Sequence, residues 1–228
     1  KIDDYTLGGF RISHGWANRE QVYFIIKFSD PIHNWLCQSP SSPYAEATFE
    51  VAPGQSVMAK VALSPVNEMN AMMNLSVEMP GWDFDEVREN ALKAWDSQLA
   101  RINATFRTEQ ESRIFYTGLY HFLYAPAVWN DVNGDYMGSD GRVKHAADFQ
   151  NYTTWSLWDT YRAAHPLATL ILRDKLKDYA QTMLHIYREQ GELPVWHLMS
   201  NETYCMVGCP AVPVLADLCL KGVEGFDY

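Results

Sequence analysis

The sequence changes from strand-like to helix-like texture near residue 64. Before this point lies the run VYFIIKF at residues 22–28, in which β-branched and aromatic residues predominate, as is typical of a β-strand. After it, apolar residues recur at helical spacing, as in Val87, Ala91, Ala94 and Trp95. This division predicts an α+β chain that is mainly α-helical, with its strands collected at the N-terminal end.

Three strands are predicted in the first 63 residues, at 19–28, 45–51 and 56–63. The turn signal Pro53-Gly54 separates the last two, so we expect a hairpin over residues 44–63. Two or three strands are too few for an independently stable sheet structure. We therefore expect the remaining strands of this domain to precede Lys1.

Helices are predicted from residue 64 onward. Ser64 followed by Pro65 fits the start of the first helix. Asp83 is the expected N-cap of a helix that runs to about residue 101. Thr108 and Glu111 form a capping box at the start of a third helix, over 108–124, whose aromatic residues on every side predict a buried helix. Further helices are expected at 152–165, 173–188 and 203–221.

Composition excludes several classes of protein. Hydrophobic residues make up 47% and aromatic residues 14% of the 228 residues, which is enough for a packed core and argues against disorder. The formal net charge of −10 argues against binding to nucleic acid or to an anionic membrane surface. No apolar run reaches the roughly 18 residues that a membrane-spanning helix needs. Neither nucleic acid nor a membrane is an expected partner.

The four cysteines give no metal signature. Cys205 and Cys209 are four residues apart in a predicted helix, and no second Cys or His pair follows at the spacing of a zinc finger. We interpret all four, including Cys37 and Cys219, as buried free thiols.

A long Gly- and Asp-rich loop is predicted at residues 125–150. Its segment DVNGDYMG begins at Asp131 and places acidic and amide residues at alternate positions, as in a calcium-binding EF-hand. The match fails, because Tyr136 occupies the sixth position and Arg142 the twelfth, where glycine and glutamate are required. We expect a structured turn near a functional site instead.

Two clusters combine tryptophan with polar side chains. Trp158-Asp159 suits sugar recognition, since the ring stacks on a pyranose while the carboxylate accepts hydrogen bonds from vicinal hydroxyls. The alternative is a core tryptophan at a helix start, with Asp159 paired to Arg162. In the second cluster, Trp196 precedes Asn201-Glu202. Its alternative is a helix cap, with Glu202 bound to a nearby backbone group.

Taken together, these segments resemble glycoside hydrolase family 92, the calcium-dependent exo-α-mannosidases. The resemblance runs from about residue 61 to residue 226 and is carried by PGWDF (80–84), FYTGLYH (115–121), DVNG (131–134), SLWDTYR (156–162), LPVW (193–196) and NET (201–203) followed by Cys205-Met206. Their order and spacing are more specific than any one of them alone.

The resemblance implies a β-sandwich joined through helices to an (α/α)6 toroid. Residues 1–63 would be the last strands of the sandwich, 64–106 a helical linker, and 107–228 the first half of the catalytic toroid. It also implies exo-hydrolysis of terminal α-linked mannose, most simply α-1,2-linked, with inversion. In inverting enzymes an acid and a base stand roughly 6.5–9.5 Å apart, with water activated by the base.

The resemblance further implies which residues contact the substrate. Trp158 and Asp159 would contact the terminal mannose, with Trp196, Asn201 and Glu202 near the same pocket. We identify no catalytic acid or base in these residues, and no metal ligands, because the matching motifs of the family lie further toward the C-terminus. The implied cofactor is Ca²⁺, held by ligands outside this chain.

The expected partner is a mannose-containing glycan, either an N-glycan or a mannan, met in a secreted or periplasmic location. We expect the 228 residues alone to hydrolyse no α-mannoside at a measurable rate. Three alternatives stay open. The protein could be another type of inverting (α/α)6 glycosidase that acts on glucosides, a glycan-binding domain without turnover, or a scaffold domain whose tryptophans all lie in the core.

Overall fold

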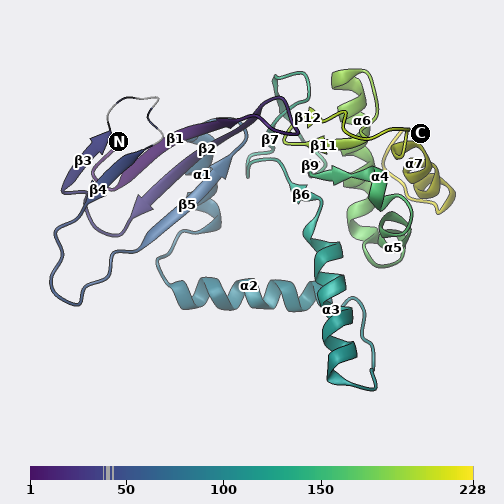
Figure 1. Ribbon diagram of the computed structural model, residues 1–228, viewed down its shortest axis with the longest axis horizontal. Coiled ribbons are helices and arrows are strands. Elements are labelled where there is room, and N and C mark those ends of the chain that lie inside the picture. Colours follow the sequence, from purple (N-terminus) through teal and green to yellow (C-terminus); the bar gives the residue numbers. More distant parts are fainter. Residues whose placement is uncertain (38, 40–41, 43, 228) are drawn as a thin grey trace.

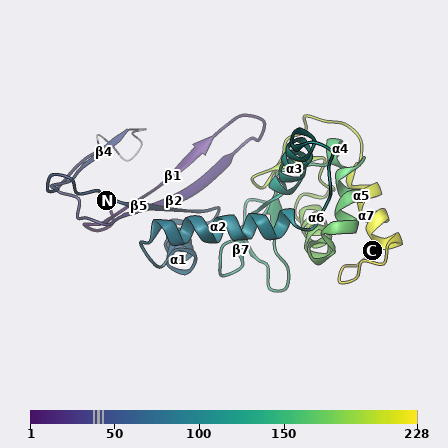
Figure 2. The same cartoon turned by 90° about the horizontal axis from the view of Figure 1, so that it is seen from below.

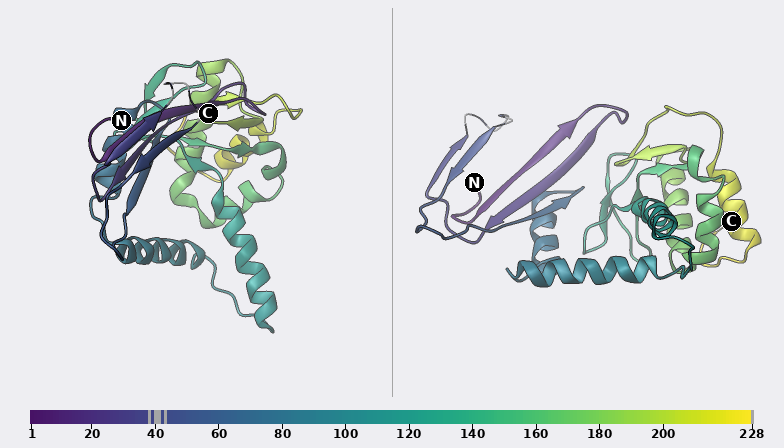
Figure 3. Two further views of the ribbon diagram at one scale, coloured as in Figure 1. Left: turned by 60° about the vertical axis from the view of Figure 1, so that its left-hand side comes forward. Right: turned by 60° about the horizontal axis from the view of Figure 1, so that its bottom comes forward.

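The computed structural model describes residues 1–37, 39, 42 and 44–227 and mixes α-helices with β-sheets (Figure 1). A β-sheet lies at the N-terminal end, and a mainly helical region contains the C-terminal half of the chain. Helix α2 runs along one side of the molecule from the N-terminal sheet to the helical region (Figures 2 and 3). The predicted mixture of α and β elements is confirmed, but seven of the twelve strands in the described residues follow residue 64, where the sequence predicted helices and loops.

The N-terminal sheet is antiparallel in the order β1-β2-β5, with bounds Thr6–Ser13, Glu20–Phe28 and Ala59–Ser64. Its central strand confirms the strand predicted at residues 19–28. Alternation along β2 directs Ile25 to the face covered by α1 (Glu68–Glu78), where Ala62, Ala71 and Leu75 complete a small core. The sheet is therefore half of a layered structure, with one face packed on a helix.

The hairpin predicted over residues 44–63 is wrong. Strand β4 (Ala45–Thr48) pairs with β3 (Asn34–Cys37), whereas β5 pairs with β2. The turn signal is nevertheless real, because Gly54 has a φ of 83° and the N–H of Gln55 donates to the carbonyl of Ala52. The turn joins strands of two different sheets. Strand β5 pairs with β2 because its apolar residues match those of β2 better than they match the polar residues of β4.

Ser64 does not cap the first helix as predicted. Asn67 is the N-cap, and its side chain accepts from the N–H of Asn70. Ser64 ends strand β5, with its hydroxyl accepting the N–H of Val66 at 2.9 Å. At the other end of α1, buried Lys60 donates to the carbonyls of Met79, Pro80 and Gly81. A cation at this position stabilises the helix C-terminus.

The next two helices begin at the predicted caps. Helix α2 (Phe84–Leu99) has Asp83 as its N-cap, and α3 (Glu109–Tyr124) has the full capping box of Thr108 and Glu111. The expectation that α3 is buried is wrong in this chain, because Leu119 is its one buried residue. The aromatic residues lie on a helix that projects away from the rest of the molecule (Figure 1).

One charged contact ties the end of α2 to the helical region. The guanidinium of Arg101 donates two hydrogen bonds to the carboxylate of Asp174, at 2.7 and 2.8 Å, and a third to the carbonyl of Ile171. The guanidinium holds the pKa of Asp174 below its usual value. A bidentate pair of this kind fixes orientation as well as distance.

The C-terminal region contains short strands and helices around a second, larger core. Its strands are β6 (Ala127–Val128), β7 (Asp135–Met137), β8 (Val143–His145), β9 (Tyr152–Thr153), β10 (Trp155–Ser156), β11 (Trp196–Leu198) and β12 (Asn201–Glu202). Its helices are α4 (Leu157–Thr160), α5 (Ala164–Ile171), the 3-10 turn η1 (Arg173–Lys175), α6 (Leu176–Gln190) and α7 (Ala211–Leu220). Residues of β9, β10 and these helices form the core, including Trp155, Leu176, Met183 and Leu218.

Two of the predicted helices in this region are wrong at their N-terminal ends. Residues 152–156 are strands β9 and β10, interrupted by Thr154 with a φ of 67°, and helix α5 continues through Pro166 in its first turn. Residues 203–210 precede α7 and are not helical. Helix α6 is confirmed, and Gly191 ends it in the left-handed conformation that favours glycine. Among the residues that the structure describes, no helix is long and apolar enough to span a membrane.

Candidate functional site

A small antiparallel sheet brings the two predicted tryptophan clusters together. In the order β10-β11-β12, Ser156 pairs with Trp196, and Leu198 pairs with Asn201. The N–H of Trp158 also approaches the carbonyl of Val195 at 3.4 Å. Residues about 40 positions apart in the sequence therefore share one side of the helical region. We did not predict this sheet, since residues 152–156 read as helix.

Asp159 lies at the start of α4 with its side chain exposed. One of its carboxylate oxygens accepts the hydroxyl of Ser156. The predicted alternative, an ion pair with Arg162, is absent from the described part of the chain. Arg162 instead places its guanidinium over the rings of Trp158, at 5.4 Å, and Tyr161, at 5.0 Å. Asp159 thus has acceptor capacity available to a ligand, beside a half-buried tryptophan.

Glu202 is buried, and its carboxylate binds the backbone. Its Oε2 accepts the N–H of Val195 at 2.8 Å, and its Oε1 accepts those of Trp196 and Thr203, both at 3.0 Å. This is the backbone-binding alternative of the sequence interpretation, although no helix begins here. The carboxylate therefore shapes the loop that presents Trp196.

Asn201 is also committed to the backbone. Its Nδ2 donates to the carbonyl of Met199 at 2.7 Å and to the carbonyl of Arg19 at 2.9 Å. The second bond crosses from the helical region to the N-terminal sheet. Asn201 consequently holds the two parts of the chain together next to Trp196.

The turn between β11 and β12 uses an unusual backbone conformation. Met199 and Ser200 have φ values of 46° and 68°, the pattern of a type I′ turn, which glycine and asparagine normally occupy. Neighbouring side chains hold the turn: Thr153 Oγ1 accepts the N–H of Met199 at 2.7 Å, and Ser200 Oγ accepts the indole N–H of Trp129 at 2.7 Å. Strain of this kind, held by surrounding contacts, is concentrated at functional sites in proteins.

His197 is the middle residue of β11, and its side chain is buried. Its Nε2 contacts the hydroxyl of Ser139 at 2.9 Å, while Nδ1 has no partner among the described residues. Burial lowers the pKa of His197 to about 3, so the ring is neutral at ordinary pH. Its position predicts a role in packing, because a buried ring is out of reach of a ligand at the surface.

A buried carboxylate supports the loop at residues 131–138. Asp131 is 2% exposed and accepts hydrogen bonds from Ser64, Asn70 and Asn74 at 2.7 to 2.8 Å. The expected structured turn is present, and it is fixed to the N-terminal sheet and α1. Sequence reasoning identified the loop, but it did not identify these three donors, which lie 57 to 67 residues earlier.

The described residues do not form a metal centre. No group of three or more His, Cys, Asp or Glu side chains is placed to hold an ion within the part of the chain that the structure describes. The carboxylate of Asp131 is satisfied by side-chain N–H and O–H donors, which leaves it unsuited to ligate a cation. The residues present therefore do not fit a calcium site by themselves.

All four cysteines are free, as predicted, but their expected burial is wrong. Cys205 and Cys209 are exposed in the non-helical segment before α7, and Cys37 and Cys219 are half-buried. For Cys205 and Cys209 the predicted helix at residues 203–210 is absent, which leaves both thiols on an exposed segment.

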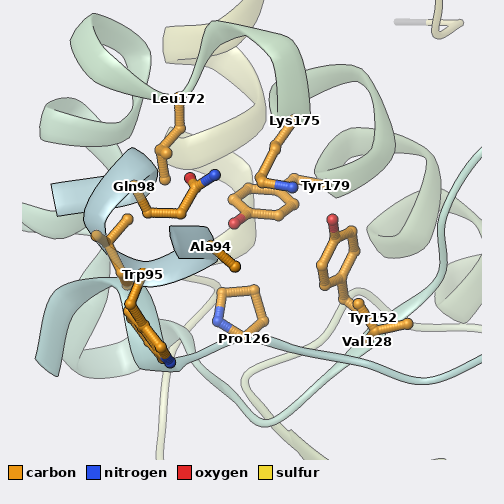
Figure 4. A pocket seen from close by; sticks show the side chains of 10 residues that line it. Ala94, Trp95, Gln98, Pro126, Val128, Tyr152, Leu172, Lys175 and Tyr179 are labelled. Carbon is orange, nitrogen blue, oxygen red and sulfur yellow. The ribbon is translucent and has the colours of Figure 1, made fainter. Parts of the chain in front are cut away.

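The molecule also has an apolar cavity of about 280 Å³ between α2, α3 and α6 (Figure 4). Trp95 and Gln98 of α2 face Tyr152 and Tyr179 across it. None of the five predicted sugar-contact residues lines this cavity. A smaller cavity of about 180 Å³ beside it is lined by His165 and Trp155.

Known proteins identify the family. The sequence model of the glycosyl hydrolase family 92 catalytic domain matches residues 70–228. The chain belongs to glycosyl hydrolase family 92. This confirms the resemblance drawn from the motifs.

Solved family members have the same fold over this chain. A GH92 α-mannosidase from Bacteroides thetaiotaomicron gives a TM-score of 0.88 at 33% identity, over 100% of this chain and 34% of that chain. A structure of that enzyme in complex with mannoimidazole gives the same TM-score and identity. An inverting GH92 mannosidase from B. thetaiotaomicron VPI-5482 gives 0.86 at 26% identity, over 98% of this chain and 32% of that chain.

A curated relative is similar over part of the sequence. It is described as an uncharacterized secreted glycosidase from Arthroderma benhamiae and is 26% identical over 172 residues, 74% of this chain and 18% of that protein. The chain thus spans about a third of the solved GH92 enzymes and less than a fifth of this relative.

Proposed function

We propose that the protein of which these residues are part hydrolyses terminal α-linked mannose from mannose-containing glycans such as N-glycans or mannans. The observation that carries this proposal is the match to solved GH92 α-mannosidases over the whole chain, one of them in complex with mannoimidazole. The exposed carboxylate of Asp159 beside Trp158 supports it, since this pair suits a sugar with vicinal hydroxyls.

The catalytic reaction is proposed to invert the anomeric configuration, with α-1,2-linked mannose as the preferred substrate. An acid protonates the leaving oxygen while a base activates water on the opposite face of the sugar. Both groups are proposed to lie outside the 228 residues. The role of this chain is then to bind and orient the glycan, and the isolated chain is expected to be inactive.

Calcium is proposed as the cofactor, with its ligands outside this chain. A hard divalent cation with oxygen ligands can bind sugar hydroxyls. Because the described residues do not form a cation site, we assign none of them to calcium. Removal of calcium from the complete protein with a chelator, followed by its restoration, tests this proposal.

The domain division is proposed to follow the family resemblance, with residues 1–63 in a β-sandwich, 64–106 in a linker and 107–228 in half of an (α/α)6 toroid. One feature of the sheet supports the sandwich. The face opposite α1 presents apolar side chains that are exposed or half-buried, namely Val22, Phe24, Ile26, Phe28, Val61 and Leu63. An apolar second face is what a sheet that packs on another sheet requires.

The test is a set of assays on the complete protein. We expect mannose to be released from α-1,2-mannobiose faster than glucose from the corresponding glucoside, with β-mannose as the first product seen by NMR. Tight binding without release of mannose favours the alternative of a glycan-binding protein without turnover. Preferred release of glucose favours a glucosidase on the same fold. A secreted or periplasmic location is proposed too, and cell fractionation tests it.

A further inference from the structure

The tip of the β1–β2 hairpin reaches the predicted sugar site. In Figures 1 and 3 the hairpin extends from the N-terminal sheet toward β12. Two contacts establish the approach: Asn201 Nδ2 donates to the carbonyl of Arg19 at 2.9 Å, and the rings of Trp16 and Trp196 lie 5.4 Å apart between centroids. Trp16 thus brings an aromatic ring from the N-terminal hairpin into contact with this region.

The backbone of this tip is fixed by several contacts. Ala17 is fully buried, and the N–H of Gly15 donates to its carbonyl at 3.1 Å. Below the tip, Ser13 Oγ donates to the carboxylate of Glu20 at 3.0 Å. The position of Trp16 is therefore set by the fold.

Trp16 is nevertheless 67% exposed. An apolar ring in water costs free energy, at roughly 25 cal/mol per Å² of apolar surface left unburied. A polar residue would suit a hairpin tip better if the residue only had to make a turn. An exposed tryptophan on a fixed backbone is instead typical of a surface that binds a flat apolar group.

The two tryptophans form an apolar corner. Their ring planes are inclined at 76°, so the exposed Trp16 stands nearly perpendicular to the half-buried Trp196. Trp158 is close to Val195, the residue before Trp196. The backbone of Trp158 therefore lies next to the strand that carries Trp196, and the ring of Trp196 contacts that of Trp16.

We infer that Trp16 stacks on the sugar ring next to the terminal mannose, at the rim of the site. This inference rests on the proposed function, because it assumes that the terminal mannose binds near Trp158 and Asp159. An exo-acting enzyme encloses the terminal sugar and leaves the next one partly in solvent. Trp16 fits the second position, since it is exposed and reaches the site from the β1–β2 hairpin, whereas Trp158 and Asp159 belong to the helical region.

The experiment uses the complete protein with Trp16→Ala and Trp16→Phe. Each variant is assayed on α-1,2-mannobiose and on α-mannosyl fluoride, whose leaving group carries no second sugar. Mannobiose affinity is measured by calorimetry in parallel. The control is Tyr44→Ala, which removes a comparably exposed ring, 60% exposed, just before β4 at the far end of the molecule (Figure 1).

We expect Trp16→Ala to lower kcat/KM for mannobiose about tenfold more than for the fluoride, which corresponds to about 1.4 kcal/mol. Trp16→Phe should restore part of the loss, because it keeps a flat ring, and Tyr44→Ala should match wild type on both substrates. Calorimetry should show the same order of affinities for mannobiose.

Two results overturn the inference. One is an equal loss on both substrates with a lower melting temperature, which means that Trp16 is covered by the rest of the protein. The other is a Trp16→Ala variant that matches Tyr44→Ala in every assay. Wild-type protein that neither hydrolyses nor binds mannobiose refutes the proposed function, and the inference with it. Wild-type protein that binds without turnover leaves the calorimetric comparison to decide.

Discussion

Asn74 binds Asp131 and the next residue, Val132, across the boundary between α1 and the loop before β7. The Nδ2 of Asn74 donates to Oδ1 of Asp131 at 2.7 Å, while its Oδ1 accepts the N–H of Val132 at 2.9 Å. The other carboxylate oxygen of Asp131 accepts from Ser64 and Asn70. A buried carboxylate with three side-chain donors connects the N-terminal sheet, helix α1 and the loop that leads into the sugar site.

Asp131→Asn should therefore destabilise the complete protein by about 2 kcal/mol, because the new amide faces donors with a donor of its own. Urea unfolding curves give the difference from wild type. The matched control is Asp148→Asn, which changes an exposed carboxylate whose surface ion pair with Lys177, at 3.6 Å, is worth less than about 1 kcal/mol. Equal effects of the two substitutions would refute the role assigned to Asp131.

Glu202→Gln tests the loop that presents Trp196. The glutamine keeps one oxygen but directs an N–H₂ group at backbone N–H groups, so at least one of the three bonds from Val195, Trp196 and Thr203 is lost. A hydrogen bond to a charged group contributes about 1.5–3 kcal/mol, so local opening should become at least about tenfold more frequent.

Hydrogen exchange of the peptide that covers residues 193–204, followed by mass spectrometry, measures this change. Glu192→Gln is the control, because Glu192 is exposed and accepts the hydroxyl of Tyr204. Unchanged exchange in Glu202→Gln would mean that the carboxylate is available to bind substrate directly.

Predictions from the sequence were right for helix caps and strands that depend on contacts between neighbouring residues. The caps at Asp83 and Thr108 and the strand at 19–28 depend on neighbouring residues, and all are present. The errors arose where distant contacts decide. Residues 152–156 become strands because β9 pairs with β6 and β10 pairs with β11, and β5 pairs with β2 instead of β4.

The candidate site shows the same division. The motifs indicated Trp158 and Trp196, but Trp16 lies 180 residues from Trp196 and joins the site through the fold. A glycine turn between two strand-like runs, as at Gly15, could have indicated an aromatic residue at a hairpin tip. The three donors to Asp131 carry no such local signal, since serine and asparagine are common near helix starts.

His165 should make stability depend on pH. Its ring is 7% exposed beside Trp155 and Tyr179, and its Nε2 has no partner among the described residues. Burial lowers its pKa to about 4, whereas an unfolded histidine has a pKa of about 6.5. The unfolded state therefore binds a proton first as pH falls, and stability is lost between about pH 6.5 and pH 4.

His165→Phe removes this contribution. We expect the variant to gain on wild type as pH falls from 7 to 5, by up to about 1.4 kcal/mol per pH unit. Unfolding by urea at pH 7, 6 and 5 measures the difference, with exposed His33→Phe as the control. A difference between His165→Phe and wild type that stays constant with pH would contradict the assignment.

Asp159→Asn tests the substrate contact on which the proposed function depends. The substitution keeps the shape of the side chain and an oxygen for Ser156, but it removes the charge that strengthens hydrogen bonds from sugar hydroxyls. Loss of one or two such bonds should lower kcat/KM on α-1,2-mannobiose by about 10- to 100-fold, from about 1.5–3 kcal/mol per bond. The control is Asp217→Asn, whose carboxylate lies on α7 and pairs with Lys221, the residue that follows this helix. Kinetics of the complete protein decide the matter, together with melting temperatures that should stay near wild type. A variant that keeps more than half of the wild-type kcat/KM shows that Asp159 does not contact the sugar.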